Sequence, residues 1–518
     1  MAAPNFHDDD PHEAMSAVGW SDGLPVVPPT TERLERMLTG TTRPRDAVLG
    51  LCPPMYSRVT VEAVAVNAVL AGCDARHLRI VIAAVEAMLQ PPFNIHGVHA
   101  TTMGATPAVV VSGPARIECG LNSAHGALGS GSRANLCIGR AVKLVLQNVG
   151  GAKLGGTEST TLGTPMKVSM CVAENEELLE CIGWAPYHAA ARGFREGESC
   201  VTVVACTSGP QQLVDFATRD AATLVALLGC HLAACYAPHM PLVNEALVVI
   251  SPEHATTLQR GGVASKAQLA DCLWHAANRA SARHLLRTIR LTAPAGGVSH
   301  AKLAVGALLA LLAFALSLLA DLLGALFPSR ALDVLPLHSI VNGYALKAPK
   351  FVAPSSFHIV VAGAKAGKFS AVSPGFGVGL PPRPTANLSR ACSAPVEPTP
   401  PTLGHMARVP ALSPVLSFLA TPTGEHTTVA PLAPAKRPSC LGAAGGTGSR
   451  AAQTTLGLLD ISKFGGGAVL DRLQARLEAE HTGLRCRRLC KPTFSRPMPE
   501  DLVDSFDGCD AVVMALAD

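Results

Sequence analysis

Apolar stretches with helical spacing alternate with short runs of β-branched residues over the first part of the chain. Three stretches repeat apolar residues at helical intervals, which predicts helices: RVTVEAVAVNAVLAGC (58–73), ARHLRIVIAAVEAMLQ (75–90) and ANLCIGRAVKLVLQN (134–148). Two β-rich runs are continuously apolar, as strands buried on both faces are: PAVVVSGP (107–114) and SCVTVVACTSGP (199–210). This alternation predicts one large α/β domain over residues 15–295.

Residues 296–335 interrupt this pattern with an apolar insert. Leu303 to Ala320 carries no charge, and after Asp321 the apolar run continues to Phe327, which is long enough for a helix that spans a bilayer. Two interpretations stay open, a membrane helix and an insert that does not cross a membrane. The following SFHIVVAGAKAGKFSAV (356–372) returns to strand and turn character, so we expect the large domain to continue over residues 336–379.

A linker and a second domain follow. Residues 380–453 are rich in Pro, Thr, Ala and Gly, which predicts a linker because this composition buries little apolar surface. Residues 454–518 then read as a strand (TTLGLLD), a helix (AVLDRLQARLEAE), a strand (LRCRRL), a short helix (PEDLVDSF) and a strand (CDAVVMALAD). This order predicts half of a doubly wound, flavodoxin-like fold. Since no helix follows to cover the last strand, either the protein ends at this edge of the sheet or, as we expect, the half-domain is truncated.

Composition and charge narrow the class of protein. The chain has 518 residues, of which 48% are hydrophobic and 4% aromatic, and a net charge of +4 without a Lys/Arg-rich run, so we expect no nucleic-acid binding. Its 16 cysteines include no C-x-x-C pair, which favours reduced, buried thiols. Residues 1–14 are acidic, so we expect a flexible N-terminus without a secretory signal peptide. The protein should be intracellular, either cytoplasmic or membrane-associated through the insert.

Two glycine-rich segments come close to nucleotide-binding patterns. AGAKAGKFS (362–370) has Ala362 and Phe369 where a P-loop requires Gly and Ser or Thr, so we expect no nucleotide hydrolysis. Lys365 and Lys368, which stand beside glycines, are candidates to bind a small anion. GSGSRA (129–134) matches the dinucleotide-binding fingerprint but follows no convincing strand, so a glycine-rich loop that caps a helix is favoured.

Polar side chains in glycine-flanked loops are further candidates for a site. NIHGVHATT (94–102) brings two histidines close in sequence, but the glycine between them and the lack of a third ligand at suitable spacing argue against a metal. We therefore predict neither a metal site nor a bound cofactor. The candidates for substrate or anion binding in this part of the chain are His96, His99, Asn122, Arg133, Asn135 and Arg140.

The C-terminal half-domain resembles the UGSC (seleno)proteins. The resemblance rests on GLLDISKFGGGAVLDRLQARL (457–477), KPTFSRPMPEDLVD (491–504) and above all CDAVVMALAD (509–518). In that family, the strand that ends in Ala-Asp is followed by U-G-S-C, where U is selenocysteine or, in other members, cysteine. The large domain of the family is resembled by GWSDGLPVVPPT (19–30), GSRANLCIGRAVKLVLQNVGG (131–151), CVAENEE (171–177) and VVAGAKAGKFSAV (360–372).

The resemblance implies that the reactive chalcogen lies beyond the given sequence. Selenocysteine is encoded by UGA, which routine translation reads as a stop, so we expect it directly after Asp518 and expect the chain as given to be inactive. A selenolate or thiolate at a strand's carboxyl end, near a helix N-terminus, is stabilised in its charged form. The catalytic candidates around that position are Asp460, Lys463, Lys491, Ser495 and Asp518.

Taken together, these features predict a selenol- or thiol-dependent redox or nucleophilic enzyme, of oxidoreductase or lyase type, that acts on a small molecule. The alternative is a non-catalytic, membrane-anchored binding protein in which Leu303–Phe327 tethers two soluble modules. The two differ in membrane partitioning, which only the alternative requires. The sequence predicts neither the substrate nor the oligomeric state.

Overall fold

A computed structural model of the chain contains two compact units, residues 1–421 and residues 422–518. The structure describes residues 10–195, 197–237, 243–292, 349–365, 367–377, 389–400, 454–460, 466–481, 484–491, 504–507 and 509–515, together with residues 315, 319, 322 and 502. The large unit thus holds the described residues up to 400, and the small unit holds those from 454 onwards.

Strands of the large unit form two four-stranded sheets and a separate hairpin. The first sheet has the order β10 (Cys392–Pro395), β5 (Cys200–Cys206), β3 (Thr106–Ser112), β4 (Cys171–Ala173). The second sheet has the order β6 (Gln211–Val214), β9 (Phe369–Pro374), β7 (Ala246–Ile250), β8 (Phe357–Val361). The antiparallel hairpin consists of β1 (Val48–Cys52) and β2 (Ser57–Thr60).

Helices of the large unit alternate with these strands along the chain. They are α1 (Pro11–Ala17), α2 (Thr31–Leu38), α3 (Val61–Leu70), α4 (Leu78–Leu89), α5 (Ile95–His99), α6 (Ala115–Glu118), α7 (Arg133–Asn148), α8 (Glu176–Ile182), α9 (Tyr187–Arg192), α10 (Ala221–Ala233), α11 (Pro252–Arg260) and α12 (Lys266–Thr292). Short 3-10 helices cover Ala75–His77, Pro91–Phe93, Pro165–Lys167 and Pro354–Ser356. The prediction of an α/β fold is confirmed, and the predicted helices at 58–73, 75–90 and 134–148 correspond to α3, α4 and α7.

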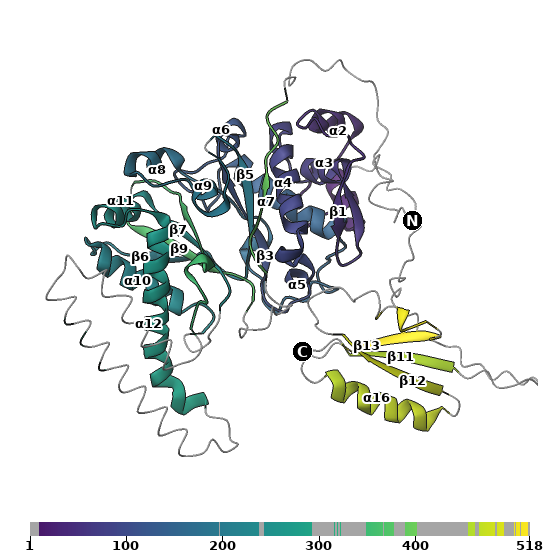
Figure 1. Ribbon diagram of the computed structural model, residues 1–518. Helices are drawn as coiled ribbons and strands as arrows, with labels where there is room; N and C mark the ends of the chain where they lie inside the picture. The colour runs from purple at the N-terminus through teal and green to yellow at the C-terminus, as the bar shows by residue number, and fades with distance from the viewer. Residues whose placement is uncertain are drawn as a thin grey trace, which may run out of the picture. The chain divides into compact units, whose positions relative to one another are not determined.

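The two sheets pack face to face between two layers of helices, as the separation of the layers in Figure 1 shows. In β3, β4, β5, β7, β8 and β9, alternate residues belong to different cores. In β3, Val109 and Val111 pack with α3, α4 and α7, whereas Ala108 and Val110 face the other sheet, where they meet β7 and β8. In β7, Val248 packs with α10, α11 and α12. Because both faces are covered, the strands read as continuous apolar runs in the sequence.

Both sheets have the same topology, and they exchange a strand with each other. β3, β4 and β5 are consecutive, with β3 parallel to β4 and antiparallel to β5, and the next strand, β6, pairs antiparallel with β9 in the second sheet. β7, β8 and β9 repeat this arrangement, and the next strand, β10, pairs antiparallel with β5 in the first sheet. The large unit therefore consists of two halves with the same topology, and each half contributes one edge strand to the sheet of the other half.

Helix α7 lies unusually close to the segment before β4. Its N-terminus is capped by Ser132, whose side chain accepts a hydrogen bond from the backbone N–H of Asn135, so the interpretation of GSGSRA as a helix-capping loop is confirmed. At Gly139 a Cβ atom would lie 2.4 Å from Oγ of Ser169 and 2.6 Å from the backbone nitrogen of Met170. The Ser169 hydroxyl donates to the carbonyl of Leu136 at 2.7 Å, which holds this contact in place.

Replacement of Gly139 by alanine should destabilise the large unit, although alanine is the better helix former. The added methyl group would collide with backbone, and overpacking of this kind costs about 1–3 kcal/mol. Urea denaturation followed by tryptophan fluorescence measures the effect. Leu136→Ala, at an exposed position of the same helix, is the control and should cost less. A stabilising effect of Gly139→Ala would contradict the close packing.

The predicted linker contains one strand of the large unit. Residues 389–400 lie within the predicted linker 380–453, but they include β10, which pairs with β5, so the linker prediction is wrong for these residues. The pairing buries Cys392 and Ala394 against the first sheet.

Apart from residues 315, 319 and 322, the insert Leu303–Phe327 lies outside the described residues. Among the helices that the structure describes, none is both long and apolar enough to cross a membrane.

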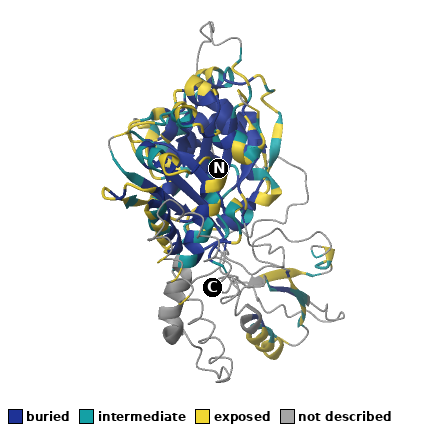
Figure 2. Cartoon of the chain, turned by 60° about the vertical axis from the view of Figure 1, so that its left-hand side comes forward, coloured by how far each residue is buried: buried dark blue, intermediate teal, exposed yellow. Residues whose placement is uncertain are grey.

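The small unit contains a three-stranded parallel sheet with the order β12 (Leu484–Cys490), β11 (Thr454–Asp460), β13 (Ala511–Ala515) and one described long helix, α16 (Gly466–Glu480). This is the strand order expected for half of a doubly wound sheet. Its described core is small, with Leu458 and Leu470 buried at the centre. Figure 2 shows the outer side of α16 exposed to solvent.

Candidate functional site

The carboxyl ends of all three strands of the small unit meet at one edge of the sheet. Asp460 ends β11 and lies in register with Cys490 at the end of β12 and with Ala515 at the end of β13. The backbone N–H of Lys491 donates to the carbonyl of Asp460 at 2.7 Å, which joins the two strand ends. The structure therefore brings the predicted residues Asp460 and Lys491 together.

Lys491 places a buried basic side chain at this edge of the sheet. Its side chain is 7% exposed, and burial lowers the pKa of its ammonium group from the usual value. The neighbouring thiol of Cys490 is exposed. A carboxylate, an amine of lowered pKa and a thiol at the ligand-binding edge of a parallel sheet suit acid–base and nucleophilic chemistry. The predicted residues Lys463, Ser495 and Asp518 lie outside the described residues.

In the large unit, two predicted residues line a pocket of about 510 Å³ at the N-terminal end of α7. Asn122 and Arg133 contribute to its wall, together with Asp74 and His77. The guanidinium of Arg133 donates to the carbonyl of Gly72 at 2.9 Å, which orients it there. Burial lowers the pKa of His77 to about 4, so this ring is neutral at physiological pH. The pocket is polar and suits a small polar molecule.

Asn135 does not line this pocket, but its side chain holds Asn122, which does. Its side-chain oxygen accepts from the backbone N–H of Asn122 at 2.9 Å, and its side-chain nitrogen donates to the carbonyl of Asn122 at 2.9 Å. The residue is buried, and its amide is fully engaged in holding the loop. We therefore assign Asn135 a positioning role for Asn122.

The other predicted anion-binding residues lie in three separate places. Arg140 forms a bidentate ion pair with Asp22 at 2.8 and 2.7 Å. Lys365 is exposed, and Nζ of Lys368 donates to the carbonyl of Thr218 at 2.8 Å. The glycine-rich turn that carries these lysines joins β8 to β9, whereas a P-loop leads from a strand into a helix. Nδ1 of His96 lies 3.1 Å from the hydroxyl of Tyr56.

His99 belongs to a buried basic cluster, which we define as His99, Lys143 and Lys167 together with Glu158. His99 is 2% exposed and Lys143 is 8% exposed. Among the described residues, no group forms a hydrogen bond with either ring nitrogen of His99 or with Nζ of Lys143. Lys167 forms an ion pair with Glu158 at 2.7 Å. A buried polar group without a partner costs about 1–3 kcal/mol, so these orphaned groups need an explanation.

Burial and neighbouring charges lower the pKa values of Lys143 and His99 in this cluster. Burial and the positive charge of Lys167 lower the pKa of Lys143 to about 7, while Glu158 opposes the shift. Burial and the charges of Lys143 and Lys167 hold the pKa of His99 well below its usual value. Neither Lys143 nor Lys167 was among the residues predicted from the sequence. Lys143 shares its helix face with Arg140 and Gln147, so its position in α7 did not set it apart from ordinary polar residues.

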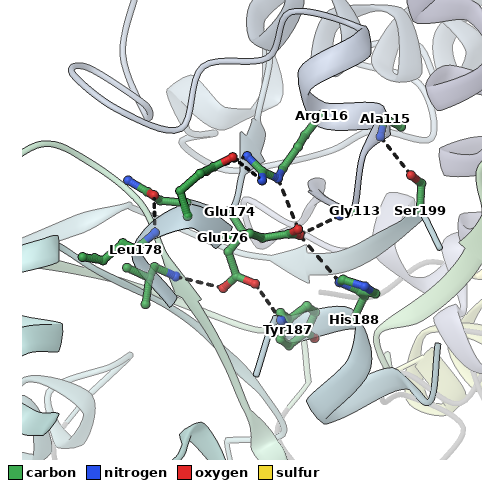
Figure 3. A network of polar contacts seen from close by, with 12 residues as sticks. Gly113, Ala115, Arg116, Glu174, Glu176, Leu178, Tyr187, His188 and Ser199 are labelled. Atoms are coloured by element: carbon green, nitrogen blue, oxygen red, sulfur yellow. Dashed lines mark hydrogen bonds and ion pairs between the residues drawn. The ribbon is translucent and has the colours of Figure 1, made fainter. Parts of the chain in front are cut away.

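A second group that the sequence analysis missed is the carboxylate network after β4, shown in Figure 3. Glu174 is fully buried, forms an ion pair with Lys266 at the start of α12, and accepts from the backbone N–H groups of Tyr187 (2.6 Å) and Val361 (3.1 Å). These partners come from both halves of the repeat, so the network ties the edge of one sheet to the edge of the other.

Glu176 extends the same network towards the loop after β3. Its Oε1 accepts from the backbone N–H of Gly113 at 2.6 Å and lies 3.6 Å from Nδ1 of His188, and its Oε2 lies 3.4 Å from Nε of Arg116 (Figure 3). Glu174 accepts from three donors, and Glu176 accepts from Gly113 and pairs with Arg116, so we interpret this network as a contribution to the stability of the fold. Its signal in the sequence was the run of acids directly after a strand.

Comparison with known proteins finds a family match within the small unit. Residues 422–518 match the model of the UGSC family, and this range coincides with the second compact unit. The resemblance of the C-terminal segment is thus confirmed. The stretches of the large unit that were compared with the same family lie outside the match, so that part stays a prediction. No curated protein and no solved structure matches the chain.

Proposed function

We propose that the protein is a selenol- or thiol-dependent enzyme of redox or nucleophilic type, and that its reaction takes place at the carboxyl edge of the small unit's sheet. The observation that carries the proposal is that the UGSC match coincides with a unit whose parallel strands all end at that edge. Ligands of open parallel sheets bind at such an edge. A small-molecule substrate there would meet Asp460 and Lys491 at the ends of two adjacent strands.

Lys491 and the N-terminus of α16 suit a chalcogenolate at this edge. α16 follows β11 and begins on the side of the sheet where β11 ends, so the backbone N–H groups of its first turn and its dipole favour an anion there. A cationic Lys491 would favour the same charged form of a thiol or selenol. The thiolate or selenolate would form a bond to an electrophilic centre of the substrate while the bond from that centre to a leaving group breaks, and the leaving group would carry away the electron pair. Asp460 would orient a polar group or a proton of that substrate.

The reading frame after the codon for Asp518 tests the identity of the chalcogen. In the family pattern U-G-S-C follows directly on an Ala-Asp pair, as at Ala517-Asp518 here, so we expect an in-frame UGA or Cys codon followed by codons for Gly, Ser and Cys. For UGA, labelling of the expressing cells with radioactive selenium should mark the product. UAA or UAG at this position, without Gly-Ser-Cys in frame, would refute the proposed chalcogen.

Lys491→Met should raise the pKa of the reactive thiol or selenol of the natural protein by about one unit, because an opposite charge nearby favours the ionised form. The pH dependence of alkylation by iodoacetamide measures this pKa. Arg485→Met, at an exposed position near the other end of β12, is the matched control and should leave the profile unchanged. Equal profiles for Lys491→Met and the natural protein would show that Lys491 does not act on the reactive group.

A further inference from the structure

We propose that His99, Lys143 and Lys167 form a buried binding site for an oxyanion, a carboxylate or a phosphate, within the large unit. The site lies outside the unit that matches the UGSC family and outside the edge proposed above for the reaction. It therefore stands independently of the proposed function.

Three elements of the large unit converge on this site. At Gly139, α7 lies directly against Ser169 and Met170, and Lys143 follows Gly139 by one helical turn on the same face. Lys167 ends the 3-10 helix Pro165–Lys167, and only Val168 separates it from Ser169, so it comes from the segment that α7 contacts. His99 ends α5, shortly before Thr102, whose carbonyl accepts from Thr161 in the loop that carries Glu158, and burial and the charges of both lysines lower the pKa of His99.

Residues 151–164 form a loop that returns over the segment after His99. The backbone N–H of Thr161 donates to the carbonyl of Thr102 at 2.8 Å, and the hydroxyl of Thr160 donates to the carbonyl of Met103 at 3.3 Å. The same loop carries Glu158, whose carboxylate pairs with Lys167. The loop therefore lies beside the segment that follows His99 and brings one carboxylate to Lys167.

The donors of this site match an oxyanion better than any group that the described structure supplies. Nζ of Lys143 and the ring nitrogens of His99 are buried and lack hydrogen-bond partners among the described residues. An oxyanion offers several acceptor lone pairs and can bridge an ammonium group and an imidazole N–H. When Lys143 is protonated, two ammonium groups face the single carboxylate of Glu158, so one further negative charge balances the cluster. A water molecule could accept hydrogen bonds from these donors, but it would not supply that charge.

Thermal unfolding of the whole protein tests the site, with inorganic phosphate and succinate as separate probes against chloride at equal ionic strength. The large unit contains all three tryptophans, Trp20, Trp184 and Trp274, so their fluorescence reports on it. We expect a saturable rise in the unfolding midpoint with at least one probe, because a ligand that binds only the folded state raises it. The probe with the lower saturating concentration identifies the source as phosphate or carboxylate.

Two variants and one control separate binding from general salt effects. Lys143→Met and Lys167→Gln should each weaken the response by about tenfold or more in probe concentration, since each removes one charge-assisted contact. Lys153→Met removes an exposed lysine just after α7 and should respond as the natural protein does. A response to phosphate and succinate no larger than that to chloride, or an equal response in Lys167→Gln and Lys153→Met, would overturn the site.

Discussion

Glu174→Gln should lower the free energy of unfolding of the large unit by about 3–5 kcal/mol, the range expected when one partner of a buried ion pair is removed. The substitution leaves Lys266 buried without its carboxylate, and Lys266 is only 5% exposed. Burial already lowers the pKa of Lys266, and Glu174 opposes that shift, so the variant should release the proton more readily. Urea denaturation followed by the fluorescence of Trp20, Trp184 and Trp274 measures the loss within the large unit.

A matched control and a double variant make this result specific. Glu180→Gln changes an exposed glutamate in α8 and should cost less than about 0.5 kcal/mol. Glu174→Gln combined with Lys266→Met removes both charges and should recover part of the stability, because the cost comes mainly from the unpaired charge. If the double variant were as unstable as the sum of the two single variants, the ion pair would not be the element that joins the two halves.

The stability difference between Lys143→Met and the natural protein should change with pH by about 1 kcal/mol for each pH unit between 7 and 10. The pKa of Lys143 is lowered to about 7 in the folded chain from an ordinary value of 10.5. Between these values the unfolded chain binds more protons, so the stability of the natural protein rises with pH. The methionine variant lacks this term, so we expect it to be the more stable protein at pH 7 and to lose that advantage towards pH 10.

Comparing the two proteins at each pH separates the contribution of Lys143 to the free energy of unfolding from the contributions of other titrating groups. Buried thiols such as Cys171 and Cys206, whose pKa values are raised by burial, act in the opposite direction at alkaline pH, but they contribute equally to both proteins. Chloride buffers without phosphate or carboxylate keep the proposed oxyanion site empty during the measurement. Lys153→Met serves as the control, and its difference from the natural protein should be constant. A constant difference for Lys143→Met as well would show that Lys143 titrates normally in the folded state.

The candidate sites were predictable from the sequence only in part. Asn122 and Arg133 were singled out because polar residues stood in a glycine-rich loop, and they do line one pocket. His99 was singled out beside His96, but its partners in the basic cluster come from elements more than forty residues further along the chain, so local spacing carried no sign of them. Arg140 was grouped with the same loop, although its guanidinium pairs with Asp22 near the N-terminus.

The sequence by itself determined the local elements and the similarity of the small unit to the UGSC family. Apolar periodicity specified α4 and α7, continuous β-rich runs specified β3 and β5, and the alternation of strand and helix after residue 454 specified the parallel half-sheet. These features depend on neighbouring residues, because helix and strand periods are expressed over a few positions of the chain. The motif stretches of the last segment likewise sufficed to identify the UGSC resemblance.

Only the tertiary structure decided how the large unit is assembled. The pairing of β10 with β5 and of β6 with β9 exchanges edge strands between two sheets, and it places β10 inside what the composition indicates to be a linker. The Glu174–Lys266 ion pair and the cluster of His99, Lys143 and Lys167 arise from the same assembly. Strands buried on both faces are apolar at every position, so their sequences reveal that they are buried but not which strand lies beside them.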